Sequence, residues 1–121
     1  MEYSKLIRYL FLIAIIASAS EKMVSYIGQK TFPLMIVEGN PITKIWINTY
    51  GLEFGHLMAF IISVITALIL KELALTTFKL LKENATLQAI SQGIFIAIFA
   101  FLIIDTTRIF ANNLHLLLSH I

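Results

Sequence analysis

The chain has few of the residues that cover the surface of a water-soluble domain. Only 13% of its 121 residues are charged, and it contains two prolines, five glycines and no cysteine. The missing cysteines exclude disulfides, thiolate metal sites and a cysteine nucleophile. The formal net charge is only +2 and the basic residues are scattered, so nucleic acid is not an expected partner. No serine nucleophile motif or phosphate-binding loop is present; this favours a protein that is not an enzyme without excluding one, and no particular cofactor is indicated.

Apolar residues, by contrast, are abundant. They make up 59% of the sequence, and the mean hydropathy is +0.88. We predict an all-α membrane protein with a single domain, residues 1–121, and about three transmembrane helices, at roughly 6–27, 51–71 and 87–118. Gly28 is expected to end the first helix. The connection at roughly 28–44 holds both prolines and an apolar stretch too short to cross a bilayer, which predicts an interfacial or re-entrant segment between the first and second spans. Asn40 and Pro41 are typical of a helix start, so the second helix is expected to begin near Pro41 and enter the bilayer near Gly51.

The basic residues at the span ends predict an orientation. The side of the N-terminus and of the loop between the second and third spans carries five: Lys5, Arg8, Lys71, Lys79 and Lys82. The other side carries four: Lys22, Lys30, Lys44 and Arg108. This excess predicts a multi-pass protein of the cell membrane with a cytoplasmic N-terminus. The start of the chain also imitates a secretory signal that ends at Ala17-Ser18-Ala19, but apolar character continues beyond it, so we expect a retained first span.

A ridge of small residues runs along the second predicted span. One stands at every fourth position: Gly51, Gly55, Ala59, Ser63 and Ala67. In lipid, where no hydrophobic force draws helices together, small residues promote association because they let backbones approach closely. The ridge therefore predicts tight packing, with a second copy of the chain or with other membrane subunits.

Each predicted span also carries ionisable residues toward one end. Counting about 1.5 Å per residue from Leu6, Lys71 and Leu87 places Glu21 about 22 Å deep, Glu53 and Asp105 about 27 Å, His56 about 22 Å and Arg108 about 32 Å. Charged groups are costly in hydrocarbon and usually face the interior of a helix bundle. We therefore predict one intramembrane polar cluster, made of Glu21, Glu53, His56, Asp105, Arg108 and Asn112.

Helical periodicity places these groups on faces. Ala14, Ser18, Glu21 and Ser25 share one face of the first span, from which Lys22 points away by about 100°. On the third span, the predicted inward face consists of Gly93, Ala97, Asp105, Arg108 and Asn112.

The chemistry of this cluster has several interpretations. Glu53 and His56 form an E-x-x-H pair, a spacing that carboxylate-bridged metal sites use, with Glu21 and Asp105 as further candidate ligands. Alternatively, His56 makes a packing hydrogen bond or acts as a protonatable switch. Arg108 either pairs with Asp105 at i, i+3 or reaches Glu21 or Glu53 on another helix. Glu21 is then a structural acid, or a site for a proton or ligand.

One stretch resembles a known family. Glu38-Gly39-Asn40-Pro41, followed by Gly51 at the start of the next helix, is similar to the Glu-x-Asn-Pro signature of a family of small uncharacterised prokaryotic membrane proteins. Glu21 and Ser25 stand where that family usually has Asp and Thr. The resemblance covers roughly residues 18–60, and it implies a compact multi-helix membrane module without implying an activity.

Two functional hypotheses follow from these patterns. In the first, the protein is an accessory or structural subunit of a membrane complex or a homo-oligomer, and its partners are lipid and other membrane subunits or itself. In the second, the carboxylate and histidine groups bind a metal, a proton or a polar ligand in an enzyme or an ion-conducting protein.

Overall fold

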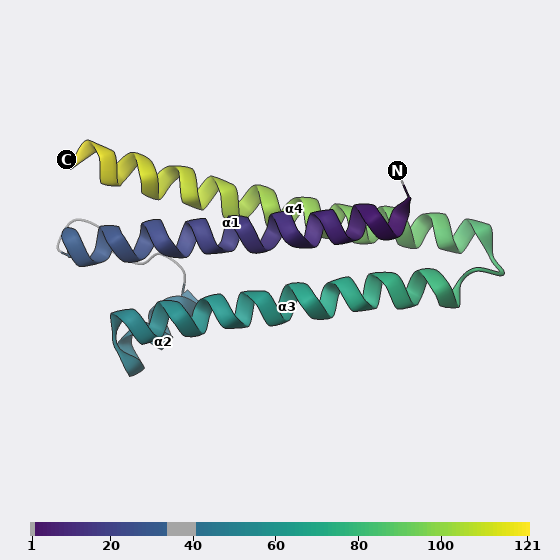
Figure 1. The fold of residues 1–121 in the computed structure, drawn as a ribbon, viewed down its shortest axis with the longest axis horizontal. Coiled ribbons are helices and arrows are strands. Elements are labelled where there is room, and N and C mark those ends of the chain that lie inside the picture. The colour runs from purple at the N-terminus through teal and green to yellow at the C-terminus, as the bar shows by residue number, and fades with distance from the viewer. Residues whose placement is uncertain (1, 34–40) are drawn as a thin grey trace.

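The computed structural model describes residues 2–33 and 41–121, which form four helices. These are α1 (Tyr3–Thr31), α2 (Pro41–Tyr50), α3 (Leu52–Leu80) and α4 (Ala85–Ser119). Figure 1 shows α1 and α4 running in one direction beside the antiparallel α3, with the short α2 packed near the start of α3. By length and composition, α1, α3 and α4 can each cross a membrane. The prediction of an all-α protein with three such helices is confirmed.

The first helix is longer than predicted. Gly28 does not end α1, because the backbone N–H of Phe32 still donates to the Gly28 carbonyl oxygen at 2.8 Å. Gly28 is buried, and a glycine inside a helix costs only about 1 kcal/mol, which packing along the rest of the helix can offset. The connection from α1 to α2 is correspondingly shorter than the predicted 28–44, and its residues 34–40 lie outside the described part of the chain.

A sharp turn at Gly51 separates α2 from α3. The predicted start at Pro41 is confirmed, but the two helices do not form one continuous rod. Gly51 has φ 95°, a left-handed conformation that glycine adopts without steric cost. Past the turn, α2 lies so close to α3 that a Cβ atom added to Gly55 would stand 2.6 Å from the Cα of Ile47. The small residue at position 55 thus permits the contact between these two helices.

The last helix begins beyond the apolar part of the bundle. The Asn84 side chain caps α4 by accepting from the backbone N–H of Leu87 at 3.0 Å. One turn later, the Gln88 amide donates to the Phe78 carbonyl oxygen at 2.9 Å, and the Phe78 ring lies 4.9 Å from that of Tyr3. The first turns of α4 therefore lie beside the last turns of α3, on the far side of Lys71 from the rest of the bundle.

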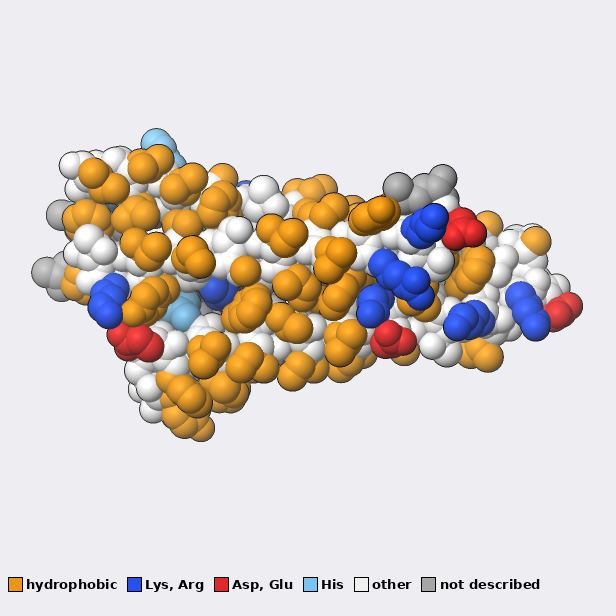
Figure 2. Space-filling view, in the orientation of Figure 1, with side chains coloured by type: hydrophobic (Ala, Val, Ile, Leu, Met, Phe, Trp, Pro, Cys, Tyr) orange, Lys and Arg blue, Asp and Glu red, His pale blue; other side chains and the backbone are white. Residues whose placement is uncertain are grey.

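The core of the bundle is small and its outer surface is apolar. Ile7, Ala74 and Phe99 form the fully buried cluster, while the other large apolar side chains of the described residues are exposed or half-buried. Figure 2 shows a band of hydrophobic side chains between charged groups near the two ends. The band is about 33 Å long from Arg8 to Lys30 at ~1.5 Å per residue, close to the ~30 Å hydrocarbon thickness of a bilayer.

Candidate functional site

A buried ion pair lies on the inner face of α1. The Lys22 ammonium is 3.1 Å from the Glu21 carboxylate and donates a hydrogen bond of 3.0 Å to the hydroxyl oxygen of Thr43. All three residues are at least nine-tenths buried. The prediction that Lys22 points away from the buried face is wrong, because α2 packs beside it and Thr43 accepts a hydrogen bond from its ammonium. The pair makes the interior neutral, as burial of charge requires.

A chain of hydrogen bonds continues the polar layer from α1 to α3. The Gln29 amide donates to the Ser25 hydroxyl at 3.0 Å, and the Gln29 carbonyl oxygen lies 3.0 Å from Nε2 of His56. With the amide in this orientation, Nε2 of His56 carries the proton and donates. Ser25, Gln29 and His56 are all buried, so these bonds join α1 to α3 in the interior of the bundle.

Glu53 lies at the rim of the bundle, outside this buried layer. Its carboxylate is 3.4 Å from the Lys30 ammonium and accepts from the Tyr26 hydroxyl at 3.3 Å. The Glu53 and Lys30 side chains are both exposed. Glu53 and His56 are three residues apart in sequence, yet one side chain points to solvent and the other into the bundle.

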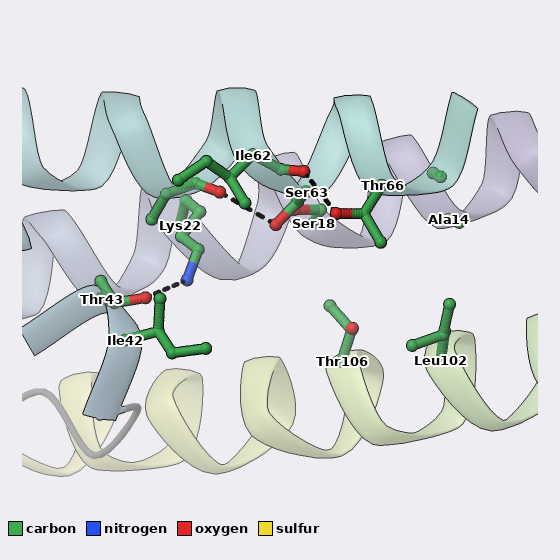
Figure 3. Close-up of a pocket in the computed structure, with 12 residues that line it drawn as sticks. Ala14, Ser18, Lys22, Ile42, Thr43, Ile62, Ser63, Thr66, Leu102 and Thr106 are labelled. Atoms are coloured by element: carbon green, nitrogen blue, oxygen red, sulfur yellow. Dashed lines mark hydrogen bonds between the residues drawn. The ribbon is translucent and has the colours of Figure 1, made fainter. Parts of the chain in front are cut away.

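Beside the buried ion pair is a cavity of about 200 Å³. Figure 3 shows that all four helices contribute to its lining. The Lys22 and Thr43 side chains lie at one end, and Thr106 and Leu102 of α4 lie across the cavity from Ser63 and Thr66 of α3. Five hydroxyl side chains line it: Ser18, Thr43, Ser63, Thr66 and Thr106. The Ser63 and Thr66 hydroxyls donate to carbonyl oxygens of their own helix, so their oxygen lone pairs remain available as acceptors.

Another ion pair lies on the outside of the bundle, on α4. Nη2 of Arg108 is 2.8 Å from the Asp105 carboxylate, with the Arg108 side chain 70% exposed and that of Asp105 43% exposed. Of the predicted alternatives for Arg108, the structure has the pair within one helix. Asn112, one turn further along α4, is also exposed.

This exposed pair lies within the apolar band, because Phe99, six residues before Asp105, packs against Ile7 at the start of the band. Thr106, the neighbour of Asp105, lines the cavity together with Ser63 of α3. Along α3, at ~1.5 Å per residue, Ser63 is about 15 Å from Glu53 and about 12 Å from Lys71. The depth of about 27 Å that we predicted for Asp105 is wrong, because the count began at Leu87. The turns of α4 that follow Leu87 lie beyond the band.

The prediction of which face of α4 points into the bundle is also wrong. Its members are exposed or half-exposed, namely Gly93, Ala97, Asp105, Arg108 and Asn112. The helix instead turns Ser91, Phe99 and Thr106 toward α1 and α3. Apolar side chains surround α4, so hydrophobic periodicity could not decide which face packs inward.

The predicted cluster is therefore divided into three places. Glu21 and His56 belong to the buried layer, Glu53 to the rim, and Asp105, Arg108 and Asn112 to the outer face of α4. Within residues 2–33 and 41–121, no three His, Asp or Glu side chains gather closely enough to hold a metal ion. Of the interpretations of His56, its hydrogen bond to Gln29 matches the packing role.

The small-residue ridge faces the inside of this chain. Gly55, Ala59 and Ala67 are buried, Ser63 is half-buried, and Gly51 is exposed in the turn. Gly55 contacts α2, whereas Ala59, Ser63 and Ala67 line the cavity. Much of the ridge is thus occupied by packing within one copy.

Lys22, Gln29 and Thr43 are functional candidates that the sequence patterns missed. Gln29 lies four residues after Ser25 and therefore extends the predicted polar face of α1 by one turn, so this signal was available. Thr43 is 1% exposed, but its burial depends on the packing of α2, which no periodicity in ten residues reveals. No family model, curated protein or solved structure matches the chain. Glu38, Gly39 and Asn40 of the Glu-x-Asn-Pro stretch lie outside the described residues, and the family resemblance stays a prediction.

Proposed function

We propose that this chain is a three-span membrane protein that works as a subunit of a larger membrane assembly. The observation that carries the proposal is the exposed Asp105–Arg108 pair, which lies within the apolar band. In an isolated copy within a bilayer, this pair would face hydrocarbon. Ionisable groups at that depth almost always face protein or a water-filled space, because their desolvation is costly. A protein surface that covers α4 satisfies this requirement.

The buried polar layer supports a structural role within that subunit. Glu21 and Lys22 neutralise each other, and Gln29 joins His56 to Ser25. Such contacts hold α1, α2 and α3 together without drawing on the outer face of α4. The assembled subunit therefore presents a preformed helix to its partner, and the basic residues of the N-terminal end favour a cytoplasmic position for that end.

Photocrosslinking in the native membrane tests this function. A benzophenone amino acid replaces Phe101, which is 68% exposed and lies one turn before Asp105. The matched control position is Ile65, which is 50% exposed on α3. We expect protein adducts from position 101 and mainly lipid adducts from position 65. Lipid adducts alone from both positions would contradict the proposal.

The central cavity favours a second function, the binding of a small neutral polar solute or of water. Its walls combine the Lys22 ammonium with hydroxyl oxygens, and its volume of about 200 Å³ is enough for several water molecules at ~30 Å³ each. Because Glu21 neutralises Lys22, the site does not favour an anion. This function is compatible with a role as a subunit.

Thiol labelling tests whether the cavity holds water. The chain has no cysteine of its own, so Ser63→Cys introduces a single thiol of nearly the same size. We expect a charged methanethiosulfonate reagent, which needs water and a thiolate, to modify position 63 in membranes. Ile65→Cys on the outer face of α3 should resist it. Equal resistance at both positions would show a dry cavity and contradict this function.

A further inference from the structure

The exposed face of α4 carries a regular stripe of side chains. Successive members are separated alternately by four and three residues: Ile94, Ile98, Phe101, Asp105, Arg108, Asn112 and His115. None of them is buried; Phe101, for example, is 68% exposed. We call this stripe the α4 seam. A repeat of 3.5 residues is the spacing at which two helices interlock side by side along their length.

The charges of the seam suit a second copy of the same surface. Asp105 and Arg108 contribute one negative and one positive group, and no net charge, within a single turn. Two copies in one membrane have the same orientation, so a two-fold axis along the membrane normal makes their α4 helices parallel and places each seam position opposite itself. The second copy's Asp105 then lies within reach of Arg108. Four charges meet at the axis and sum to zero.

The residue one turn further along the seam is also self-complementary. The Asn112 side chain carries both a donor and an acceptor, so it can pair with the same residue of a second copy. An asparagine in the seam between two helices fixes their register and favours a pair of helices. We infer that the partner covering α4 is a second copy of this chain, an inference that rests on the proposed function. The two copies contact each other through parallel α4 seams, with the Asp105–Arg108 pairs at the two-fold axis.

Disulfide formation between copies tests where they meet. In native membranes, Ile98→Cys, whose side chain belongs to the seam, should give a disulfide-linked dimer on mild oxidation. Ile65→Cys on the outer face of α3 is the control and should not. Equal dimer yields at the two positions, or none at position 98, would overturn the inference.

Charge exchange at the axis then separates a second copy from any other partner. In the Ile98→Cys background, Asp105→Arg alone and Arg108→Asp alone each bring like charges together, and the dimer yield should fall by about tenfold or more. The double exchange Asp105→Arg/Arg108→Asp should restore it. Co-expression of the two single variants with different tags should give mixed dimers, which also shows that both variants fold. Unchanged dimers in the single variants, or no mixed dimers, would contradict a two-fold axis at this pair.

Loss of the subunit role and loss of the second copy would give different experimental results. Adducts between position 101 and a different protein, with no dimer through Ile98→Cys, would leave the subunit role in place and remove the second copy. Lipid adducts alone would remove both. A dimer at position 98 that responds to charge exchange supports both.

Discussion

At the scale of single residues, the interior of this protein is built on polar groups that satisfy one another. Lys22 pairs with Glu21 and donates to Thr43, while Gln29 joins Ser25 to His56. In a low-dielectric interior such bonds are strong, and loss of one member leaves its partner desolvated. The sequence predicted the burial of Glu21 from its face of the helix. It could not predict the burial of Lys22, because that burial depends on α2, whose Thr43 contacts the Lys22 ammonium.

Removal of one member of the buried ion pair should be costly. Lys22→Met keeps the length of the side chain and removes its charge, so the Glu21 carboxylate loses the ammonium that neutralises it. We expect the free energy of unfolding, measured by steric trapping in bicelles, to fall by about 3 to 5 kcal/mol. The double variant Glu21→Gln/Lys22→Met restores neutrality and should recover most of that loss. A double variant as unstable as the single one would contradict the role of charge neutralisation.

At the scale of helices, two features matter most: the close approach of α2 to α3, and the outer face of α4, which no other helix of the described residues covers. Gly51 turns the chain between α2 and α3, and Gly55 lets Ile47 approach the backbone of α3. The spacing of small residues predicted close packing on this face of α3. The identity of the neighbour was beyond the sequence, since the same spacing suits α2 or another chain. The inward face of α4 was predicted wrongly because its polar residues were assumed to face the interior of a single copy.

The contact between Gly55 and Ile47 gives a prediction for α2. Gly55→Ala places a Cβ atom 2.6 Å from the Ile47 backbone, so α2 must shift away. We expect the free energy of unfolding to fall by about 1 to 3 kcal/mol. A cysteine at the buried position Thr43 should also become more reactive to labels in the Gly55→Ala background.

Gly93 supplies the matched control on α4. A Cβ atom there meets nothing within 4 Å, so Gly93→Ala should leave α2 in place and raise stability by about 0.5 to 1 kcal/mol through helix propensity. Equal effects of the two glycine substitutions would contradict a specific contact between α2 and α3.

At the scale of the whole molecule, the number of long helices and their apolar length could be predicted, because runs of apolar residues determine both. The depth of each charged group could not, since it depends on where each helix begins relative to the others. Because the first turns of α4 lie beside the last turns of α3, beyond the band, Asp105 and Arg108 lie within the apolar band and not at the expected rim. At that depth the exposed ion pair would contact hydrocarbon, and this is why we propose that another protein surface covers it.

The subunit role and the second copy both require that protein, and not lipid, covers the α4 seam. A spin label on Asn112→Cys, in nanodiscs formed directly from the native membrane, measures collision rates with oxygen, which concentrates in lipid, and with a water-soluble nickel chelate. The account predicts low accessibility to both reagents at position 112, and high oxygen accessibility for a label on Ile65→Cys on the outer face of α3. High oxygen accessibility at position 112, equal to that at position 65, would show that the seam faces lipid and would contradict the account.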